Sequence, residues 1–294
     1  MISILSLVYN HEKYLDSFFT GILSQKVNEG YELIIGIDKS DDTSLEICIA
    51  YQKKFPDKIK LVLHTERVGM FQNFLSVYNL CKNEYIAFCE GDDYWIDEFK
   101  LQKQLDQLRA NPAAVISYTD IKIFDEEDRS FTKNWATITK TEISIEDLLV
   151  ANVISTCSVL MRLSNVTIPL KNFEGLPMLD WPLYVHALLS GIAVYLPDQT
   201  AVYRQSFGGT YSKNSTLERL KKVNKVYCYF LQEDSLKKYR RIIKIQYFKN
   251  LYAVAIRLNK KDPNRSQFLR TVVKKSIISG DSITTAKAFI RLIV

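Results

Sequence analysis

Short apolar runs alternate with amphipathic segments through the first 118 residues, and this alternation constrains the fold more than any other feature. The apolar runs are predicted strands at residues 2–8, 31–37, 59–63, 84–88 and 115–118. Between them, segments with the 3.6-residue spacing of helices lie at about 12–25, 43–55, 71–80 and 99–108. Strands that alternate with helices in this way form βαβ units. We therefore expect an α/β fold with a mostly parallel central sheet flanked by helices.

Polar or aromatic side chains follow three of these strands directly. They are Tyr9 and Asn10, then Asp38 and Ser40, then Glu90, Asp92 and Asp93. In open α/β sheets the ligand binds beyond the carboxyl ends of the strands, so we expect these side chains at one edge. The sequence has no G-x-G-x-x-G after the first strand and no G-x-x-x-x-G-K-[ST]. These absences count against a dinucleotide enzyme and a P-loop NTPase.

The densest acidic stretch comes after the predicted strand at 84–88, where Glu90, Asp92 and Asp93 fall within four residues. Three close carboxylates repel one another, and Mg²⁺ or Mn²⁺ would relieve that repulsion. Held by one or two carboxylates, such an ion keeps coordination positions free for substrate phosphates. The alternative is an acidic turn that caps the helix beginning near Asp97, since Asp and Glu favour helix starts.

Beyond residue 118 the pattern is weaker, and beyond 215 it becomes helical and basic. Strands are predicted at 135–139, 153–161, 192–196 and 200–203, and helices at 145–150, 180–190, 216–232, 237–258, 267–278 and 282–293. Residues 216–294 carry 19 Lys and Arg against 5 Asp and Glu, a net charge of +14. Residues 1–215 carry 20 against 28, a net charge of −8.

The basic region leaves three interpretations open: a solvated helical cap, an amphipathic surface that docks on anionic membrane, and a surface for homodimerisation. Nucleic-acid binding has no recognition motif in its favour. The five cysteines are dispersed and odd in number, which indicates reduced core thiols in a cytosolic protein. No apolar run approaches the roughly 18–20 residues that span a bilayer. We expect a cytoplasmic protein, with a peripheral position at the inner face of the cell membrane as an option.

Four segments in order resemble the family 2 glycosyltransferases of GT-A fold, over roughly residues 1–212. They are Ser6–Asn10, Glu32–Ser44, Tyr85–Trp95 and Leu179–Trp181. The resemblance implies a GT-A catalytic domain at 1–212, with a nucleotide-binding half at 1–118 and an acceptor-side half at 119–212. A basic helical region at 213–294 follows. It also implies inverting, metal-dependent transfer of a sugar (hexosyltransferase class) from a nucleotide-diphosphate donor, with a UDP-sugar favoured. The acceptor would be a hydroxyl of a glycan or lipid-linked molecule in surface polysaccharide or glycoconjugate assembly.

The resemblance assigns roles residue by residue in the nucleotide-binding half. Tyr9 matches the aromatic residue that packs on the base, and Asp38 matches the carboxylate that accepts from the base imide N–H. Arg67 falls where the family often has a basic residue near the nucleotide. Asp92 and Asp93 match the metal and ribose contacts of the D-x-D motif. Together these residues imply a site for a uracil or thymine nucleotide with Mn²⁺ or Mg²⁺.

The sequence departs from the family pattern at three positions. Leu7 stands where Pro or Thr is usual, and Ile37 replaces the first Asp of the common Asp-Asp pair, which leaves Asp38 alone. Glu90 replaces the first Asp of the D-x-D motif. Glu is a competent oxygen ligand for the metal, but its extra methylene shifts the carboxylate.

On the acceptor side, Asp180 matches the general base, and its alternative role is that of a helix N-cap. Trp95 and Trp181 are candidates to line the acceptor pocket, because sugar faces stack on aromatic rings; core packing is the alternative for both. Two rival functions stay open. A nucleotidylyltransferase would normally have a Gly- and Lys-rich loop after the first strand, where Tyr9-Asn10-His11 stands. A non-catalytic nucleotide-sugar-binding module would bind UDP without turnover.

Overall fold

The computed structural model describes residues 1–132, 140–205, 215–258 and 263–279. The chain divides into two compact units. The first comprises residues 1–145, 153–175 and 183–207, and the second comprises 146–152, 176–182 and 208–294. The predicted strand at 135–139 and the predicted last helix at 282–293 lie outside the described residues.

In the described part of the first unit, ten strands form one sheet. The strands are β1 (Ile2–Val8), β2 (Tyr31–Ile37), β3 (Ile59–Leu63), β4 (Tyr85–Phe88), β5 (Tyr94–Trp95), β6 (Ala114–Asp125), β7 (Ser130–Thr132), β8 (Glu142–Ile143), β9 (Val159–Arg162) and β10 (Ile192–Gln205). Their order is β3-β2-β1-β4-β9-β6-β10-β5, with β7 paired to β6 and β8 paired to β10.

Parallel pairing joins β3, β2, β1 and β4, as the alternation of strands and helices predicted. The α/β class and the central sheet flanked by helices are therefore confirmed. Beyond β4 the sheet is mixed, because β9 runs antiparallel to both β4 and β6, while β6 and β10 pair in parallel. The two strands predicted at 192–196 and 200–203 are one strand, β10, with register shifts between Leu196 and Ala201. Pro197 lies at this irregularity, where a missing N–H is tolerated.

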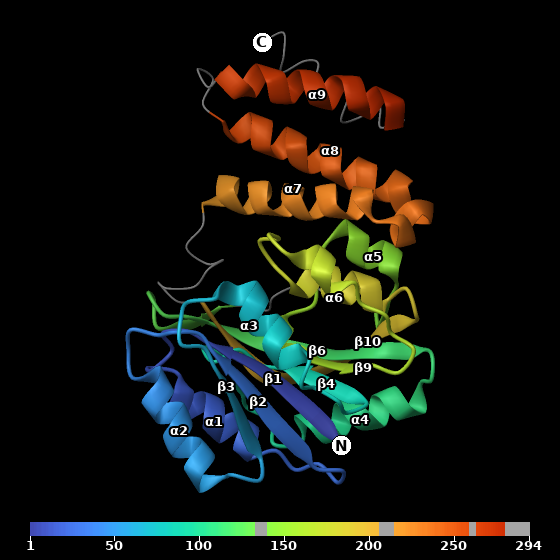
Figure 1. Ribbon diagram of the computed structural model, residues 1–294. Helices are drawn as coiled ribbons and strands as arrows, with labels where there is room; N and C mark the ends of the chain where they lie inside the picture. Colours follow the sequence, from blue (N-terminus) through green and yellow to red (C-terminus); the bar gives the residue numbers. More distant parts are fainter. Residues whose placement is uncertain (133–139, 206–214, 259–262, 280–294) are drawn as a thin grey trace. The chain divides into compact units, whose positions relative to one another are not determined.

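Helices cover both faces of the parallel strands (Figure 1). α1 (Leu15–Leu23), α2 (Ser44–Lys54) and α4 (Lys100–Ala110) lie on one face, and α3 (Gly69–Tyr78) lies on the other. Every residue of β2 is buried, as expected for a parallel strand with both faces covered. The core on the α1 side gathers Phe18, Phe19 and Ile22 of α1 with Leu101 and Leu105 of α4. This core therefore joins α1 and α4 to the sheet of the first unit.

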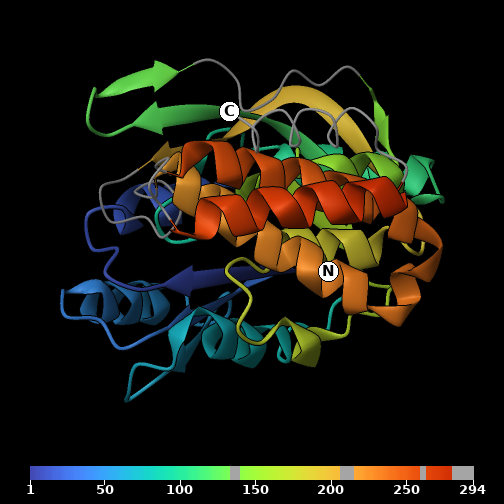
Figure 2. The same ribbon diagram turned by 90° about the horizontal axis from the view of Figure 1, so that it is seen from above.

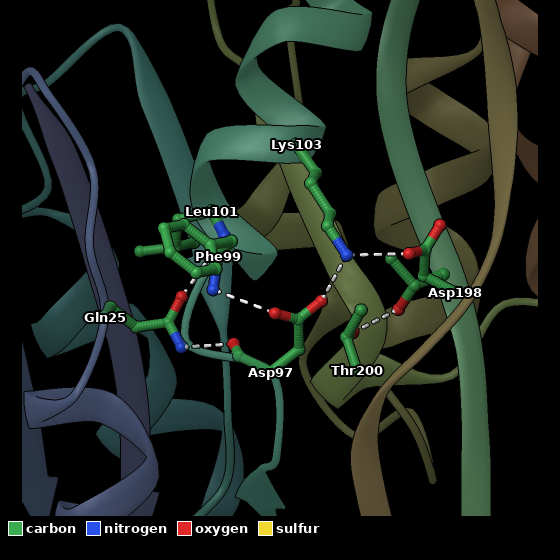
Figure 3. A network of polar contacts seen from close by, with 8 residues as sticks. Gln25, Asp97, Phe99, Leu101, Lys103, Asp198 and Thr200 are labelled. Carbon is green, nitrogen blue, oxygen red and sulfur yellow. Dashed lines mark hydrogen bonds and ion pairs between the residues drawn. The ribbon is translucent and has the colours of Figure 1, made fainter.

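A polar network fixes the segment between β5 and α4 (Figure 3). Asp97 accepts hydrogen bonds from the backbone N–H of Phe99 (2.9 Å) and from Nζ of Lys103 (2.8 Å). Lys103 Nζ also donates to Asp198 of β10 (2.7 Å), and Gln25 Nε2 donates to the Asp97 carbonyl (2.7 Å). Asp97 therefore binds the backbone N–H of Phe99, the residue just before α4 (Lys100–Ala110), and β5 separates it from the acidic stretch at 90–93.

The second unit is helical in its described residues. Its helices are most of α5 (Ile145–Val150), the start of α6 (Asp180–Ala187), α7 (Thr216–Gln232), α8 (Arg240–Arg257) and α9 (Pro263–Ser279). Ser215 and Glu218 form a capping box at the start of α7. α7, α8 and α9 lie beside one another in chain order (Figure 1, Figure 2). None of the helices in the described part of the chain combines the length and the apolar composition that spanning a membrane requires.

Candidate active site

The segments that follow β1 and β2 are joined by hydrogen bonds between side chains and backbone. Ser40 Oγ accepts from the Asn10 N–H (3.1 Å), and Asn10 Oδ1 accepts from the Asp41 N–H (2.9 Å). Glu12 Oε2 accepts from both N–H (3.0 Å) and Oγ1 (2.8 Å) of Thr43. Asn10 has a φ of 55°, a left-handed conformation that Asn adopts more readily than most residues. These bonds connect the segment after β1 to the segment after β2 at the carboxyl ends of the two strands.

Asp38 follows β2 directly and is 4% exposed. Its Oδ1 accepts from the backbone N–H of Lys39 (3.0 Å) and Val68 (2.9 Å), and its Oδ2 accepts from the Gly69 N–H (2.8 Å). A carboxylate offers about four lone-pair positions. Oδ2 therefore keeps one acceptor position beyond these three bonds, and Asp38 also fixes the loop that leads into α3.

Tyr9 and Arg67 lie together at the same edge. The guanidinium carbon of Arg67 is 4.3 Å from the centroid of the Tyr9 ring, a cation–π contact. Tyr9 is half-buried and Arg67 is exposed. The structure thus brings two of the predicted nucleotide-binding residues into contact, with Arg67 covering one face of the ring.

The turn between β4 and β5 holds the three carboxylates, and the structure distinguishes them by burial. Asp93 is 1% exposed, and its Oδ1 accepts from the backbone N–H of Arg204 (2.9 Å). Burial, and then the neighbouring Asp92 and Glu90 carboxylates, raise the pKa of Asp93 well above its ordinary range. A thiol hydrogen bond from Cys157 opposes this increase in the pKa. Asp93 is therefore a buried anchor between the turn and β10.

Asp92 is the more accessible aspartate, with a side chain that is 18% exposed. Its Oδ2 is 3.9 Å from Nε2 of His11. Gly91 allows this approach, since a Cβ there would stand 2.7 Å from Nδ1 of His11 and 2.8 Å from Cγ2 of Val8. Nδ1 of His11 is buried without a hydrogen-bond partner among the described residues. His11 thus packs against the acidic turn.

The donor set of this turn fits a hard divalent cation. Glu90, Asp92 and Asp93 lie close enough for the first two to raise the pKa of the third, which is the mutual repulsion that a cation relieves. Asp92, the more accessible of the two aspartates, is better placed to bind an ion, because Asp93 is buried and one of its oxygens already binds the Arg204 N–H. Within the described residues no three His, Cys, Asp or Glu side chains form a ready-made metal cluster.

Asp180 is the first residue of α6 and belongs to the second unit. Its Oδ2 accepts from Nδ2 of Asn152 (2.9 Å) within the same unit. Burial raises the pKa of Asp180 above its ordinary value of 3.8, while hydrogen bonds from the Trp181 backbone and from Asn152 oppose the increase. An acid with a raised pKa is a stronger proton acceptor when it is ionised, which suits a general base.

Both candidate acceptor-side tryptophans are interior residues. Trp95 is 2% exposed, and its Nε1 donates to the Cys157 carbonyl (2.9 Å). Trp181 is 3% exposed, and its Nε1 donates to the Leu148 carbonyl (2.9 Å). The Trp181 ring also packs edge-on against Tyr227 of α7 at 5.1 Å between centroids. Their burial and paired N–H groups correspond to the core-packing alternative.

One residue at this edge escaped the sequence analysis. Arg204 lies near the end of β10 and contacts the turn of Asp92 and Asp93 as well as Ser17 of α1. The predicted strand at 200–203 stopped one residue short of it. A charged residue at the end of a strand was the only signal, and it is a weak one because such residues are common on the surface.

A mixed sheet of this order with helices on both faces defines the GT-A class of folds. The chain belongs to glycosyl transferase family 2, whose sequence profile, described as "Glycosyl transferase family 2", matches residues 3–166.

Three proteins illustrate what the chain is similar to. It is 29% identical over 221 residues to the uncharacterized protein Rv1520 of Mycobacterium tuberculosis, which covers 74% of this chain and 62% of that protein. A crystal structure of Staphylococcus aureus TarS residues 1–349 with UDP-GlcNAc has a TM-score of 0.68 at 15% identity, covering 93% of this chain and 81% of that 1–349 chain. The mannosyltransferase PcManGT of Pyrobaculum calidifontis, with GDP-Man and Mn²⁺, has a TM-score of 0.59 at 12% identity, covering 99% and 86%. The chain thus spans less than two thirds of the mycobacterial relative, and the two structures support the fold.

Proposed function

We propose that this chain transfers a sugar from a UDP-sugar to a hydroxyl of a glycan or lipid-linked acceptor, with inversion at the anomeric carbon. Family membership supports glycosyl transfer. The observation that supports a base with a ring N–H donor, such as uracil, is that Oδ2 of Asp38 accepts one hydrogen bond, from the Gly69 N–H, among the described residues, beside the Tyr9–Arg67 pair. An imide N–H of uracil can donate to this oxygen, whereas a base that presents only acceptors there cannot.

In this proposal the residues of the first unit bind and orient the donor. Tyr9 packs on the base, Arg67 provides a positive charge near the nucleotide, and Asp38 accepts from the base. Asp92, with Glu90 as a second oxygen donor, would hold a divalent cation, which would supply positive charge beside the leaving diphosphate. Asp93 acts indirectly in this scheme, because its buried carboxylate fixes the turn.

Asp180 is the proposed general base. Its carboxylate takes the proton of the acceptor hydroxyl as the oxygen attacks the anomeric carbon from the face opposite the diphosphate. In-line attack of this kind inverts the configuration, so an α-linked donor gives a β-linked product. Two features support this role. Burial raises the pKa of Asp180, which makes the carboxylate more basic, and the Asn152 hydrogen bond holds its orientation.

Release of nucleoside diphosphate from a panel of UDP-, dTDP- and GDP-sugars with Mn²⁺ tests the proposal. We expect UDP-sugars to be hydrolysed fastest. The Asp92→Ala variant should lose Mn²⁺-dependent UDP binding in calorimetry, whereas Asp57→Ala, which changes an exposed carboxylate in a turn, should not. UDP binding without any turnover would favour the non-catalytic module. Turnover of a nucleoside triphosphate with a sugar phosphate would favour the nucleotidylyltransferase.

The basic second unit supports a further part of the proposal, contact with an anionic membrane at its cytoplasmic face. Lys238, Arg241, Ile242 and Ile245 line a hollow of this unit together with Glu146. Cations next to branched apolar side chains are the combination that binds an anionic lipid surface. Such contact would bring the enzyme to a lipid-linked acceptor. Homodimerisation through the same helices stays an alternative prediction.

A further inference from the structure

Arg204 binds two successive residues of the acidic turn. Its backbone N–H donates to Oδ1 of Asp93 (2.9 Å), and its Nη1 donates to the backbone carbonyl of Asp92 (2.9 Å). One residue of β10 therefore holds the turn at two successive positions, one through a side-chain oxygen and one through a backbone oxygen.

The other end of the Arg204 fork is fixed to α1. Nη2 of Arg204 donates to Oγ of Ser17 (2.8 Å), and Ser17 Oγ in turn donates to the Tyr14 carbonyl (2.8 Å). α1 packs on β5 so closely that a Cβ at Gly21 would stand 2.4 Å from the Trp95 carbonyl oxygen. The guanidinium thus connects the acidic turn to a helix that itself has little freedom to move.

Two aromatic rings lie beside the guanidinium. Its carbon lies 4.4 Å from the centroid of Tyr94 and 5.1 Å from that of Tyr14. The Tyr14 hydroxyl donates to Glu126 (2.8 Å), which holds that ring in turn. The guanidinium group of arginine is planar and can donate hydrogen bonds in two directions beside aromatic rings. The single ammonium group of lysine lacks this arrangement of donors, so lysine cannot replace arginine here.

The contacts of Arg204 restrict the backbone at Asp92. The peptide between Asp92 and Asp93 is held on both sides, because Arg204 binds the carbonyl at its start and the side chain that follows it. Fixing this peptide fixes the direction in which the Asp92 Cα–Cβ bond leaves the backbone. A residue that orients a ligand in this way typically changes metal affinity or activity by about 10–100-fold when it is lost.

We propose that Arg204 is a positioning residue, which sets the Asp92 carboxylate for the cation and diphosphate of the donor. The role of Arg204 toward the cation and the diphosphate rests on the proposed function. The ordering of the turn by Arg204 is independent of that function. The Arg204→Lys variant keeps the positive charge and the backbone bond to Asp93, and loses the fork that holds the Asp92 carbonyl and Ser17.

Arg162→Lys is a matched control for this variant. Arg162 also donates to backbone carbonyls, those of Ala114 (3.1 Å) and Pro112 (3.3 Å), and its guanidinium carbon lies 5.9 Å from the ring of Tyr85. It pairs with the first residue of β4, at the end of that strand away from the acidic turn. Both variants should therefore lose comparable free energy of unfolding, but only Arg204→Lys changes contacts with the acidic turn.

The first measurement is hydrogen exchange in the ligand-free protein. We expect Arg204→Lys to speed exchange of the backbone N–H groups of residues 90–94 by about tenfold, on the scale of one lost net hydrogen bond. Arg162→Lys should leave these residues unchanged. Ser17→Ala, which keeps Arg204 itself, should give a smaller increase. Equal exchange at 90–94 in wild type and Arg204→Lys overturns the proposal, whatever the donor is.

The second measurement is the calorimetric affinity for Mn²⁺ in the presence of UDP. The KM for Mn²⁺ and kcat are measured beside it, so that the change in one can be compared with the change in the other. Arg204→Lys should weaken Mn²⁺ affinity about tenfold or more and raise KM for Mn²⁺ more than it lowers kcat. Unchanged affinity in a folded Arg204→Lys variant contradicts the positioning role. If the wild-type chain binds neither Mn²⁺ nor UDP, the proposed function fails instead, and the exchange measurement still decides the role of Arg204 in the turn.

Discussion

At the scale of single residues, Asp38 combines structural and functional roles. Its carboxylate caps the backbone at Val68 and Gly69 and at the same time keeps the acceptor position assigned to the base. A loss of nucleotide binding on mutation is therefore ambiguous unless stability is measured beside it. The same holds for Asp93, whose burial makes it part of the interior.

The Asp38→Asn variant separates the two roles of Asp38. An amide in place of the carboxylate directs an NH₂ group at a backbone N–H, so one buried donor loses its acceptor. We expect a decrease of about 1–3 kcal/mol in the free energy of unfolding, measured by urea denaturation. UDP affinity of the folded variant should fall as well. Asp57→Asn, an exposed carboxylate, should change neither quantity. Full stability in Asp38→Asn would contradict the capping role.

The second residue-scale prediction concerns the pH dependence that Asp180 imposes. Burial raises its pKa above 3.8, so the rate should fall as the pH decreases through that raised value and protonates the base. Asn152 stabilises the ionised form and lowers the pKa. The Asn152→Ala variant should therefore raise the pKa further and move the acid limb of the kcat profile to higher pH. Asn79→Ala, on the surface, should leave the limb in place. An identical limb in Asn152→Ala would exclude Asp180 as the titrating base.

At the scale of elements, the turn between β4 and β5 depends on close packing against the loop after β1. Gly91 donates its N–H to the Leu7 carbonyl (3.0 Å), and the space above its Cα is filled by His11 and Val8. The acidic turn and the Tyr9–His11 loop therefore behave as one packed unit, in which Asp92 depends on the position of His11.

Gly91→Ala tests this packing. The added methyl would stand 2.7 Å from Nδ1 of His11, so we expect a loss of about 1–3 kcal/mol in the free energy of unfolding from overpacking. The double variant Gly91→Ala/His11→Ala should recover part of that loss, because the smaller side chain leaves space for the methyl. Additive losses in the double-mutant cycle would contradict contact between the two residues.

At the scale of the whole molecule, the two units differ most in charge. The prediction of membrane contact belongs to the basic helices of the second unit, since residues 216–294 carry +14 while 1–215 carry −8. The hollow lined by Lys238, Arg241, Ile242 and Ile245 gives this prediction a defined location. A helical cap whose lysines are solvated stays the alternative interpretation.

Charge reversal tests the membrane prediction without deleting a helix. The variant Lys238→Glu/Arg241→Glu should sediment less with vesicles of phosphatidylserine than the wild type, and the difference should shrink at high salt because screening weakens surface attraction. Lys53→Glu/Lys54→Glu, an equal change at exposed positions of α2, is the control. Equal sedimentation of both variants would remove the hollow as the membrane site.

Much of the nucleotide-binding half could be predicted from the sequence. β1, β2 and β3 have the predicted bounds, because continuous apolar runs between turn residues are the signal of buried parallel strands. The positions of Asp38 and of the acidic turn follow from the same strands. The second half was predicted less well, since the antiparallel β9 and the irregular β10 carry no periodic signal for their partners. The roles assigned to Asp180 and the other site residues stay predictions.

The sequence by itself determined which elements form and which side chains stand at strand ends, because both depend on neighbours within a few positions along the chain. The tertiary structure alone decided which carboxylate of the acidic turn is buried and which is accessible. It also brought Arg204 to Asp93, 111 positions earlier, and to Ser17, 187 positions earlier. Such contacts depend on how β10 and α1 pack on the sheet, and no local pattern of residues encodes that packing.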